Sequence, residues 1–239
     1  SGSMPWSQWH YPFENKDKFK ENFPADFIAE GVDQTRGWFY TLHALATMLF
    51  DKPAYKNVVS NGLVLDANGE KMSKSKGNSV DPFEVIQKYG ADTVRWYMMS
   101  NSSPWENLKF SEEGLQETQR KFFNTIVNTY SFFAMYANID GFTYSGSPLP
   151  KSERTEMDRW VISRLNTTVK SVDEFLDEYE PTKAAREVER FVEELSNWYV
   201  RRNRRRFWKE GKSLDKTAAY QTLYECLVSL AKIVSPTAP

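Results

Sequence analysis

The stretch that most constrains the structure of this chain is Asp66-Ala67-Asn68-Gly69-Glu70-Lys71-Met72-Ser73-Lys74-Ser75-Lys76-Gly77-Asn78-Ser79-Val80. Its three lysines are separated by small polar residues, an apolar run precedes it, and Asp81-Pro82-Phe83-Glu84 follows as a helix start. The pattern predicts a mobile cationic loop between a strand and a helix, where α/β folds place phosphate-binding groups. Composition alone also permits an ordinary solvated loop, because runs of charge commonly need no ligand.

The residues around this stretch predict an α/β unit. Residues 27–29 are a short strand candidate, and Asp33 is placed to cap a helix over about 34–50. Residues 56–65 predict a buried strand, because apolar and β-favouring side chains dominate them. Two helices are expected after the lysines, the first starting at Pro82 and ending at Gly90, the second over about 91–99.

The second half of the chain predicts helices only. From Ser111 onward, apolar residues recur at spacings of three, four and seven. A linker containing glycine and proline covers 140–152, and three further helices are expected near 155–179, 181–209 and 214–234. The expected fold class is therefore α/β followed by all-α.

Composition excludes several classes of protein. The chain has 239 residues, a net charge of −1 and one cysteine, Cys226, so no internal disulfide framework can form and a cytoplasmic setting is expected. The two histidines, His10 and His43, show no zinc-site spacing, and no bound metal is expected. No apolar run is long enough to cross a bilayer, so no membrane partner is expected. Any affinity for nucleic acid must come from a local basic patch.

Three separated segments resemble one family, in that family's order. Lys71-Met72-Ser73-Lys74-Ser75 resembles the signature loop of class I aminoacyl-tRNA synthetases. Two other segments resemble the adenylate-binding segment and the helical anticodon-binding domain of the isoleucyl-tRNA synthetases in that class: Ala29-Glu30-Gly31-Val32-Asp33-Gln34-Thr35-Arg36-Gly37-Trp38-Phe39 and Asn197-Trp198-Tyr199-Val200-Arg201-Arg202-Asn203-Arg204-Arg205-Arg206-Phe207-Trp208.

The resemblance implies a division of the chain into three parts. Residues 1–105 would form the C-terminal part of a Rossmann-type nucleotide-binding catalytic domain that carries the lysine loop. Residues 106–150 would form a connecting helical region and linker. Residues 151–239 would form a helical-bundle anticodon-binding domain, which the chain is expected to leave incomplete.

The resemblance also implies an activity for the larger enzyme in which such a segment occurs. Those enzymes activate L-isoleucine with ATP, used with Mg²⁺ as a substrate, to isoleucyl-adenylate and transfer it to tRNA(Ile). The family's other signature, His-Ile-Gly-His, and its editing domain are not among these residues, so the 239 residues alone are expected to be inactive. A monomer is expected. The alternative is a non-catalytic tRNA- or RNA-binding module with a vestigial lysine loop.

Catalytic candidates lie on the lysine loop. When ATP is cleaved at its α-phosphate, charge builds on the departing diphosphate, and cations that meet this charge lower the barrier. The resemblance assigns this role to Lys71 and Lys74 and adds Ser73 to the ATP-binding residues. Loop formation is an equally good account of the Ser73 hydroxyl. Lys76 lies outside the family's five-residue signature and is expected to be a solvated helper.

Four residues before the lysine loop are candidates for binding the aminoacyl-adenylate. The resemblance places Glu30 against this intermediate with Asp33 and Gln34 beside it, and Trp38 in the isoleucine side-chain pocket. Helix capping by Asp33 and core packing by Trp38 are the alternatives. The sequence departs from the family at Asn61-Gly62, where His-Gly is common, so an imidazole role is absent there.

A basic, aromatic-rich segment in the second half is the candidate tRNA-binding surface. Arginine pairs with phosphate, and both its plane and aromatic rings can stack on unpaired bases. The alternatives are favourable interaction with a helix C-terminus and pairing with local acids such as Glu193, Glu194 and Glu210. The candidate tRNA-binding residues are Arg201, Arg202, Arg204, Arg205 and Arg206.

Overall fold

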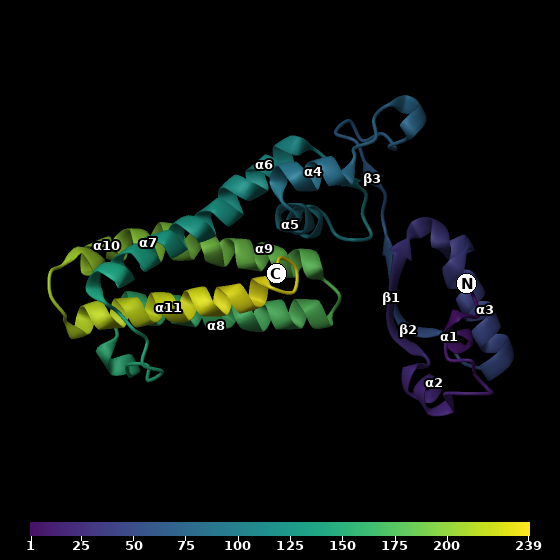
Figure 1. The fold of residues 1–239 in the computed structure, drawn as a ribbon, viewed down its shortest axis with the longest axis horizontal. Helices are drawn as coiled ribbons and strands as arrows, with labels where there is room; N and C mark the ends of the chain where they lie inside the picture. Colours follow the sequence, from purple (N-terminus) through teal and green to yellow (C-terminus); the bar gives the residue numbers. More distant parts are fainter. The chain divides into compact units, whose positions relative to one another are not determined.

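The computed structural model describes residues 1–239, and these form two compact units (Figure 1). The first unit consists of residues 1–78 and 102–110, and the second of residues 79–101 and 111–239. None of the helices combines the length and the apolar character needed to span a membrane.

The first unit contains a parallel strand pair joined by a helix. Strands β1 (Ala25–Gly31) and β2 (Tyr55–Asn61) run in register from Ala25 opposite Tyr55 to Gly31 opposite Asn61. The 3₁₀ turn η1 (Val32–Arg36) and helix α3 (Trp38–Phe50) connect them. Two short helices, α1 (Met4–Ser7) and α2 (Lys16–Asn22), precede the sheet, and Phe19 of α2 is buried among aromatic rings. The strand–helix–strand arrangement confirms the α/β expectation for this part of the chain.

The prediction of one buried strand over 56–65 is wrong. Strand β2 ends at Asn61, and Val64–Leu65 forms a separate strand, β3. Val58 on β2 is 43% exposed, and Phe27 on β1 is 46% exposed. Successive side chains of a strand point to opposite faces of the sheet. Only some of the strand side chains pack against the apolar cluster around Leu42 and Ala46 of α3. The β-favouring residues were therefore correctly placed in strands, but not in a core.

A short second ribbon holds the strand that leads into the lysines. Strand β3 pairs in parallel with β4 (Leu108–Lys109). The chain before β4 runs close beside Gly62, whose N–H donates to the Pro104 carbonyl at 2.8 Å, and a Cβ at Gly62 would collide with the Glu106 carbonyl oxygen. Only glycine fits this close backbone approach. The ribbon thereby fixes the base of the lysine loop within the first unit.

The second unit is built of helices. Stretches of π-helix, Gln119–Phe123 and Glu194–Val200, join α6 to α7 and α9 to α10 without a break, so both long helical segments expected from the sequence are present with a wider turn inside them. The bounds are α4 (Pro82–Tyr89), α5 (Ala91–Asn101), α6 (Glu112–Thr118), α7 (Asn124–Asp140), α8 (Glu156–Asp177), α9 (Pro181–Glu193), α10 (Arg201–Trp208) and α11 (Leu214–Val234), with a 3₁₀ turn at Lys151–Glu153.

Side-chain caps explain where several of these helices begin. The Asp81 carboxylate accepts a hydrogen bond from the Phe83 N–H at 2.8 Å, as predicted from the Asp-Pro start of α4. At the start of α8, Thr155 and Asp158 form a reciprocal capping box. Each cap satisfies N–H groups that have no partner inside the helix.

The core of the second unit lies between α8, α9 and α11. Phe191, Tyr199, Leu223 and Val161 are fully or almost fully buried there. Each large apolar side chain buried in this way stabilises the fold by about 1.5–3 kcal/mol.

Helices α4 and α5 belong to the second unit, although the sequence assigned them to the α/β part. Trp96 of α5 stacks on Phe122 with centroids 4.0 Å apart, and its indole N–H donates to Glu189 at 2.9 Å. Arg186 donates to the carbonyl oxygens of Ser100 and Asn101, at the end of α5. These contacts differ from the division expected at residue 105. The domain boundaries remain a prediction.

Candidate functional site

The lysine loop presents two free ammonium groups. Lys71, Lys74 and Lys76 are all exposed, and the last two lie on the 3₁₀ turn η2 (Lys74–Lys76). Lys76 forms an ion pair with Glu70 at 3.2 Å, whereas Lys71 and Lys74 have no ion-pair partner in the chain. Two of the three charges are thus available to a ligand, and they are the two predicted to act on diphosphate.

The Ser73 hydroxyl is used inside the loop. Its Oγ accepts from the Lys76 N–H at 3.3 Å and lies 3.2 Å from the Ser75 Oγ. The Ser73 N–H donates to the Asn78 side chain at 2.9 Å. These contacts cap the small turn that carries Lys74, so the loop-forming account of Ser73 is supported, and an ATP contact by its hydroxyl is not needed to explain it.

The predicted adenylate-binding residues lie on and around η1. Glu30 and Asp33 are exposed, and Gln34 is half-buried. The Gln34 amide nitrogen donates to Asp33 Oδ2 at 3.1 Å, while its oxygen accepts from the Trp38 N–H at 2.9 Å. Gln34, not Asp33, therefore supplies the side-chain acceptor for the first N–H of α3, which corrects the capping prediction. The Asp33 carboxylate stays at the surface, with Glu30 nearby at the end of β1.

Trp38 is half-buried and packs against the cluster formed by Leu42, Ala46 and Ala54. This contact supports the core-packing account of part of the ring. No hydrogen bond or ion pair joins the η1 residues to the lysine loop. The structure thus brings the acidic turn together and the lysines together, but as two separate groups of the first unit.

Four arginines of the basic segment form an open cationic surface. Arg201, Arg202, Arg204 and Arg205 are exposed, and none has an ion-pair partner in the chain. The Arg202 guanidinium lies 4.5 Å from the ring centroid of Trp198, which is 49% exposed. The alternative of pairing with local acids does not hold for these four arginines, because Glu194 pairs with Arg164 at 2.8 Å, and Glu193 and Glu210 form no ion pair. It holds for Arg206, whose Nε lies 2.8 Å from the Asp215 carboxylate.

Arg206 differs from these four and faces the core. It is 8% exposed, and two of its nitrogens donate to the fully buried Asp158 at 2.7 and 2.8 Å. Its guanidinium also donates to the Asp215 carbonyl oxygen at 2.8 Å. The prediction that Arg206 contacts tRNA is therefore wrong, because its hydrogen-bond donors are occupied by groups inside the helical unit.

Asp158 is the residue that sequence analysis missed. Besides Arg206, it accepts a hydrogen bond from the Tyr199 hydroxyl at 2.6 Å and from Thr155. Burial alone raises the pKa of Asp158, but the hydrogen bonds from Arg206 and Tyr199 outweigh it and hold the pKa below its ordinary value. The capping pattern of Thr155 and Asp158 was a signal for the helix start, but not for the partner on α10.

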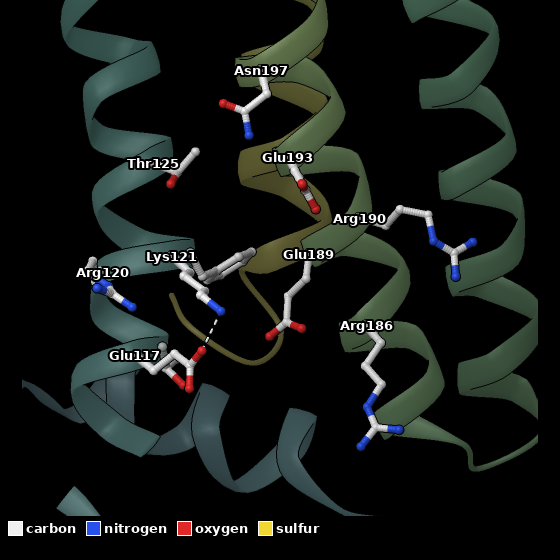
Figure 2. Close-up of a pocket in the computed structure, with 11 residues that line it drawn as sticks. Glu117, Arg120, Lys121, Thr125, Arg186, Glu189, Arg190, Glu193 and Asn197 are labelled. Atoms are coloured by element: carbon white, nitrogen blue, oxygen red, sulfur yellow. Dashed lines mark ion pairs between the residues drawn. The ribbon is translucent and has the colours of Figure 1, made fainter. Parts of the chain in front are cut away.

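A charged cleft of about 770 Å³ lies elsewhere in the second unit (Figure 2). It lies between the α6–α7 segment and α9, and Figure 2 shows acidic and basic side chains facing it from both sides. Most of these charges already have partners: Lys121 pairs with Glu117, Arg190 pairs with Glu187, and Glu189 accepts from Trp96. The cleft contains none of the predicted site residues, and its charges are explained by helix packing.

The structure offers no cluster of three or more histidine, cysteine, aspartate or glutamate side chains arranged around a metal position. Cys226 is buried in the helical core, where burial raises the pKa of its thiol. That environment makes the thiol an inert packing group.

Two family models match the chain. The first, tRNA synthetases class I (I, L, M and V), matches residues 1–111, and the second, anticodon-binding domain of tRNA ligase, matches residues 158–239.

The chain is also similar over its whole length to isoleucine–tRNA ligases. It is 62% identical to that of Cytophaga hutchinsonii over 240 residues, 62% identical to that of Bacteroides fragilis over 242, and 52% identical to that of Bacillus thuringiensis over 239. In each case all of this chain is covered, but only 22%, 21% and 23% of the relative. The chain therefore spans about a fifth of the length of the curated relatives it matches.

Solved structures share the fold at low sequence identity. The chain resembles the LeuRS–tRNA–LeuAMS ternary complex of Agrobacterium radiobacter K84 with a TM-score of 0.78 at 19% identity, covering 98% of this chain and 29% of that one. It resembles Mycobacterium tuberculosis methionyl-tRNA synthetase in complex with methionyl-adenylate with a TM-score of 0.80 at 21% identity, covering 98% and 46%. These matches confirm the expected α/β and all-α fold class. The sequence matches, which cover the whole chain, show that it belongs to the isoleucine–tRNA ligase family of class I tRNA synthetases, as a segment of its members' length.

Proposed function

We propose that this chain supplies the diphosphate-contacting loop and a tRNA-contacting surface of an isoleucine–tRNA ligase. The whole enzyme would activate L-isoleucine with Mg-bound ATP and transfer it to tRNA(Ile) in a cytoplasmic setting. The observation that carries the proposal is the state of the lysine loop. Lys71 and Lys74 are exposed without ion-pair partners, while Lys76 is paired with Glu70.

The chemistry follows from where charge appears. As the carboxylate of the amino acid attacks the α-phosphorus, the bond to the bridging oxygen breaks, and negative charge collects on the departing diphosphate. Ammonium groups that reach this charge stabilise the transition state more than bound ATP, which raises the rate and not merely the affinity. Lysine suits the task because its flexible stem can follow a moving phosphate.

The tRNA part of the proposal rests on Arg201, Arg202, Arg204 and Arg205. These side chains are exposed and unpaired on one helical segment, so binding phosphate does not require breaking an internal ion pair. Contacts of this kind bind the backbone and carry no base information, while the Trp198 ring beside Arg202 offers a stacking surface.

The test is isoleucine-dependent ATP–pyrophosphate exchange in a full-length enzyme. The chain would replace the matching segment of the Cytophaga hutchinsonii ligase, and Lys74→Ala would be compared with Lys76→Ala as the matched control. We expect Lys74→Ala to lower kcat by about 100-fold or more with little change in the KM for ATP, as when a transition-state contact is lost. Lys76→Ala should change kcat by less than about threefold, because its charge is already paired with Glu70.

Equal rates for the chimera and Lys74→Ala would refute the proposal. In that case, retention of tRNA binding would favour the alternative of a non-catalytic RNA-binding module. Tight tRNA binding and loss of exchange in Lys74→Ala would exclude that alternative.

A further inference from the structure

The side chain of Asn78 ties three points of the lysine loop together. Its amide nitrogen donates to Asp66 Oδ2 at 2.9 Å and to the Lys71 carbonyl oxygen at 3.3 Å. Its amide oxygen accepts from the Ser73 N–H at 2.9 Å. One side chain thus joins the start of the loop, its end and the backbone on either side of Met72. We call the side chains of Asp66 and Asn78 the clasp.

The other half of the clasp organises the turn that enters the loop. Asp66 Oδ1 accepts from the N–H groups of Asn68 and Glu70, at 3.0 and 2.8 Å. The backbone N–H of Asp66 donates to the Glu70 carbonyl, and Gly69 donates to the Asp66 carbonyl, both at 2.9 Å. Hydrogen bonds from Asn78 and from these N–H groups hold the pKa of the Asp66 carboxyl below its usual range. The carboxylate is therefore charged at neutral pH and serves as the fixed anchor of the loop.

The residue types of the clasp are those that its geometry requires. Only a side-chain amide both donates two hydrogen bonds and accepts others from one planar group. Aspartate at position 78 would have no donor for Asp66, and alanine would have neither donor nor acceptor. A general turn-forming role explains asparagine in a loop, but it does not explain three simultaneous bonds to points 5, 7 and 12 residues away.

We propose that Asn78 is a positioning residue for diphosphate departure, acting through the backbone of Lys71 and Ser73 to fix where the free lysines are presented. This inference rests on the proposed function. Lys71 is held at its carbonyl oxygen, and Ser73 caps the turn that carries Lys74, so both ammonium stems start from clasped backbone. A loop ordered in this way loses less conformational freedom when the lysines engage phosphate, because part of the ordering is done beforehand.

The first test is Asn78→Ala in the full-length chimera, with Asn68→Ala as the matched control. Asn68 lies in the same loop and contributes only its backbone N–H to the clasp. We expect Asn78→Ala to lower kcat for pyrophosphate exchange by about 10- to 100-fold, with the KM for ATP changed by less than about threefold, because misplaced catalytic groups affect the reacting geometry. Asn68→Ala should stay within about twofold of the parent, on the same grounds. A kcat for Asn78→Ala equal to that of Asn68→Ala overturns the proposal.

The second test exchanges donor and acceptor across the clasp. Asn78→Asp places two carboxylates against each other at a position where 2.9 Å now separates an amide from a carboxylate. Activity should fall about as far as in Asn78→Ala and should recover as pH is lowered, because a proton shared by two close carboxyl groups restores a donor. Adding Asp66→Asn to Asn78→Asp restores an amide–carboxylate pair and should raise kcat about tenfold or more above the single variant. No recovery by either route overturns the proposal.

A readout independent of activity is amide hydrogen exchange in the 239-residue chain. The Ser73 N–H should be protected in the parent and in Asn68→Ala, and should lose protection in Asn78→Ala. Unchanged protection overturns the clasp as a positioning device. The two proposals fail separately. A Lys74→Ala variant with the same exchange rate as the chimera refutes the proposed function. A fully active Asn78→Ala variant, together with an inactive Lys74→Ala variant, refutes only the role of Asn78.

Discussion

Removal of the Asp158 carboxylate should destabilise the helical unit more than any surface change. Asp158 is fully buried and accepts hydrogen bonds from Thr155, Tyr199 and Arg206. Asp158→Ala deletes all of these acceptors at once. Arg206 keeps an ion pair with the Asp215 carboxylate at 2.8 Å and its contacts with the Asp215 carbonyl oxygen and the Asn203 side chain, but it loses its only fully buried partner.

The magnitude can be worked from these contacts. Breaking a buried ion pair by removing one partner costs about 3–5 kcal/mol. The Tyr199 hydroxyl, left with only a weak 3.5 Å contact to the Ala219 carbonyl, adds a penalty of about 1–3 kcal/mol that partly overlaps with the first. A total of about 4 kcal/mol should lower Tm by about 8–16 °C for a unit of this size.

The assay is urea unfolding of the 239-residue chain followed by far-UV circular dichroism, with Asp173→Ala as the control. Asp173 lies on the same helix, is exposed and has no ion-pair partner, so its loss should change the free energy of unfolding by less than about 0.5 kcal/mol. A variant lacking both Asp158 and Arg206 should be more stable, by about 2 kcal/mol, than the sum of the single losses implies. A loss below about 1 kcal/mol for Asp158→Ala would refute the reasoning, since removal of one partner from a buried pair is expected to cost about 3–5 kcal/mol.

The same pair has a defined pH dependence. The pKa of Asp158 is lower in the folded chain than its ordinary value of about 3.9. The unfolded state therefore binds the proton more readily, so the stabilisation is fully present above about pH 4 and is lost as pH falls through the folded pKa. The difference in unfolding free energy between the parent and Asp158→Ala should narrow over that acidic window.

Three further outcomes are expected. Arg204→Glu with Arg205→Glu in the chimera should weaken tRNA binding and reduce the slope of log affinity against log salt by about 1.5–2, and an unchanged slope would make these arginines structural. Gly62→Ala should lower the unfolding free energy by about 1–3 kcal/mol because its Cβ meets the Glu106 carbonyl; a neutral result in urea unfolding would contradict that close approach. Cys226 should react with a thiol reagent at pH 8 only after denaturant is added, since burial raises the pKa of its thiol; labelling of the folded chain would show an open core.

The five arginines show which features of the basic segment could be predicted from the sequence and which could not. All five were grouped by charge, and four of them are indeed exposed. Arg206 follows Tyr199 and Asn203 by seven and three residues, and the structure buries all three on the same side of the helical segment. Its residue type argued against burial. The partner that decides the matter, Asp158, is 48 residues away in the chain, and no local pattern connects them.

The lysine loop was predictable as an element, but not as a hydrogen-bonded unit. Its charge, its small residues and its place after a strand could all be recognised from the sequence. The bond between Asp66 and Asn78 spans 12 residues, and both side chains looked like ordinary turn formers. The exposure of β2 was missed for a related reason, because β-propensity reports a fit to a pleated surface and not the presence of a covering layer.

The division of the chain at Asn78 has a mechanical consequence. The last residue of the first unit's main segment is also the residue that closes the clasp, and the next residue, Ser79, already belongs to the helical unit. One peptide bond, with Cα atoms about 3.8 Å apart, is all that separates them. No linker residues lie at this junction, so the chain enters the helical unit directly after the residue that closes the clasp. Two more crossings, at 101–102 and 110–111, mean that a single backbone cut would still leave the units tethered.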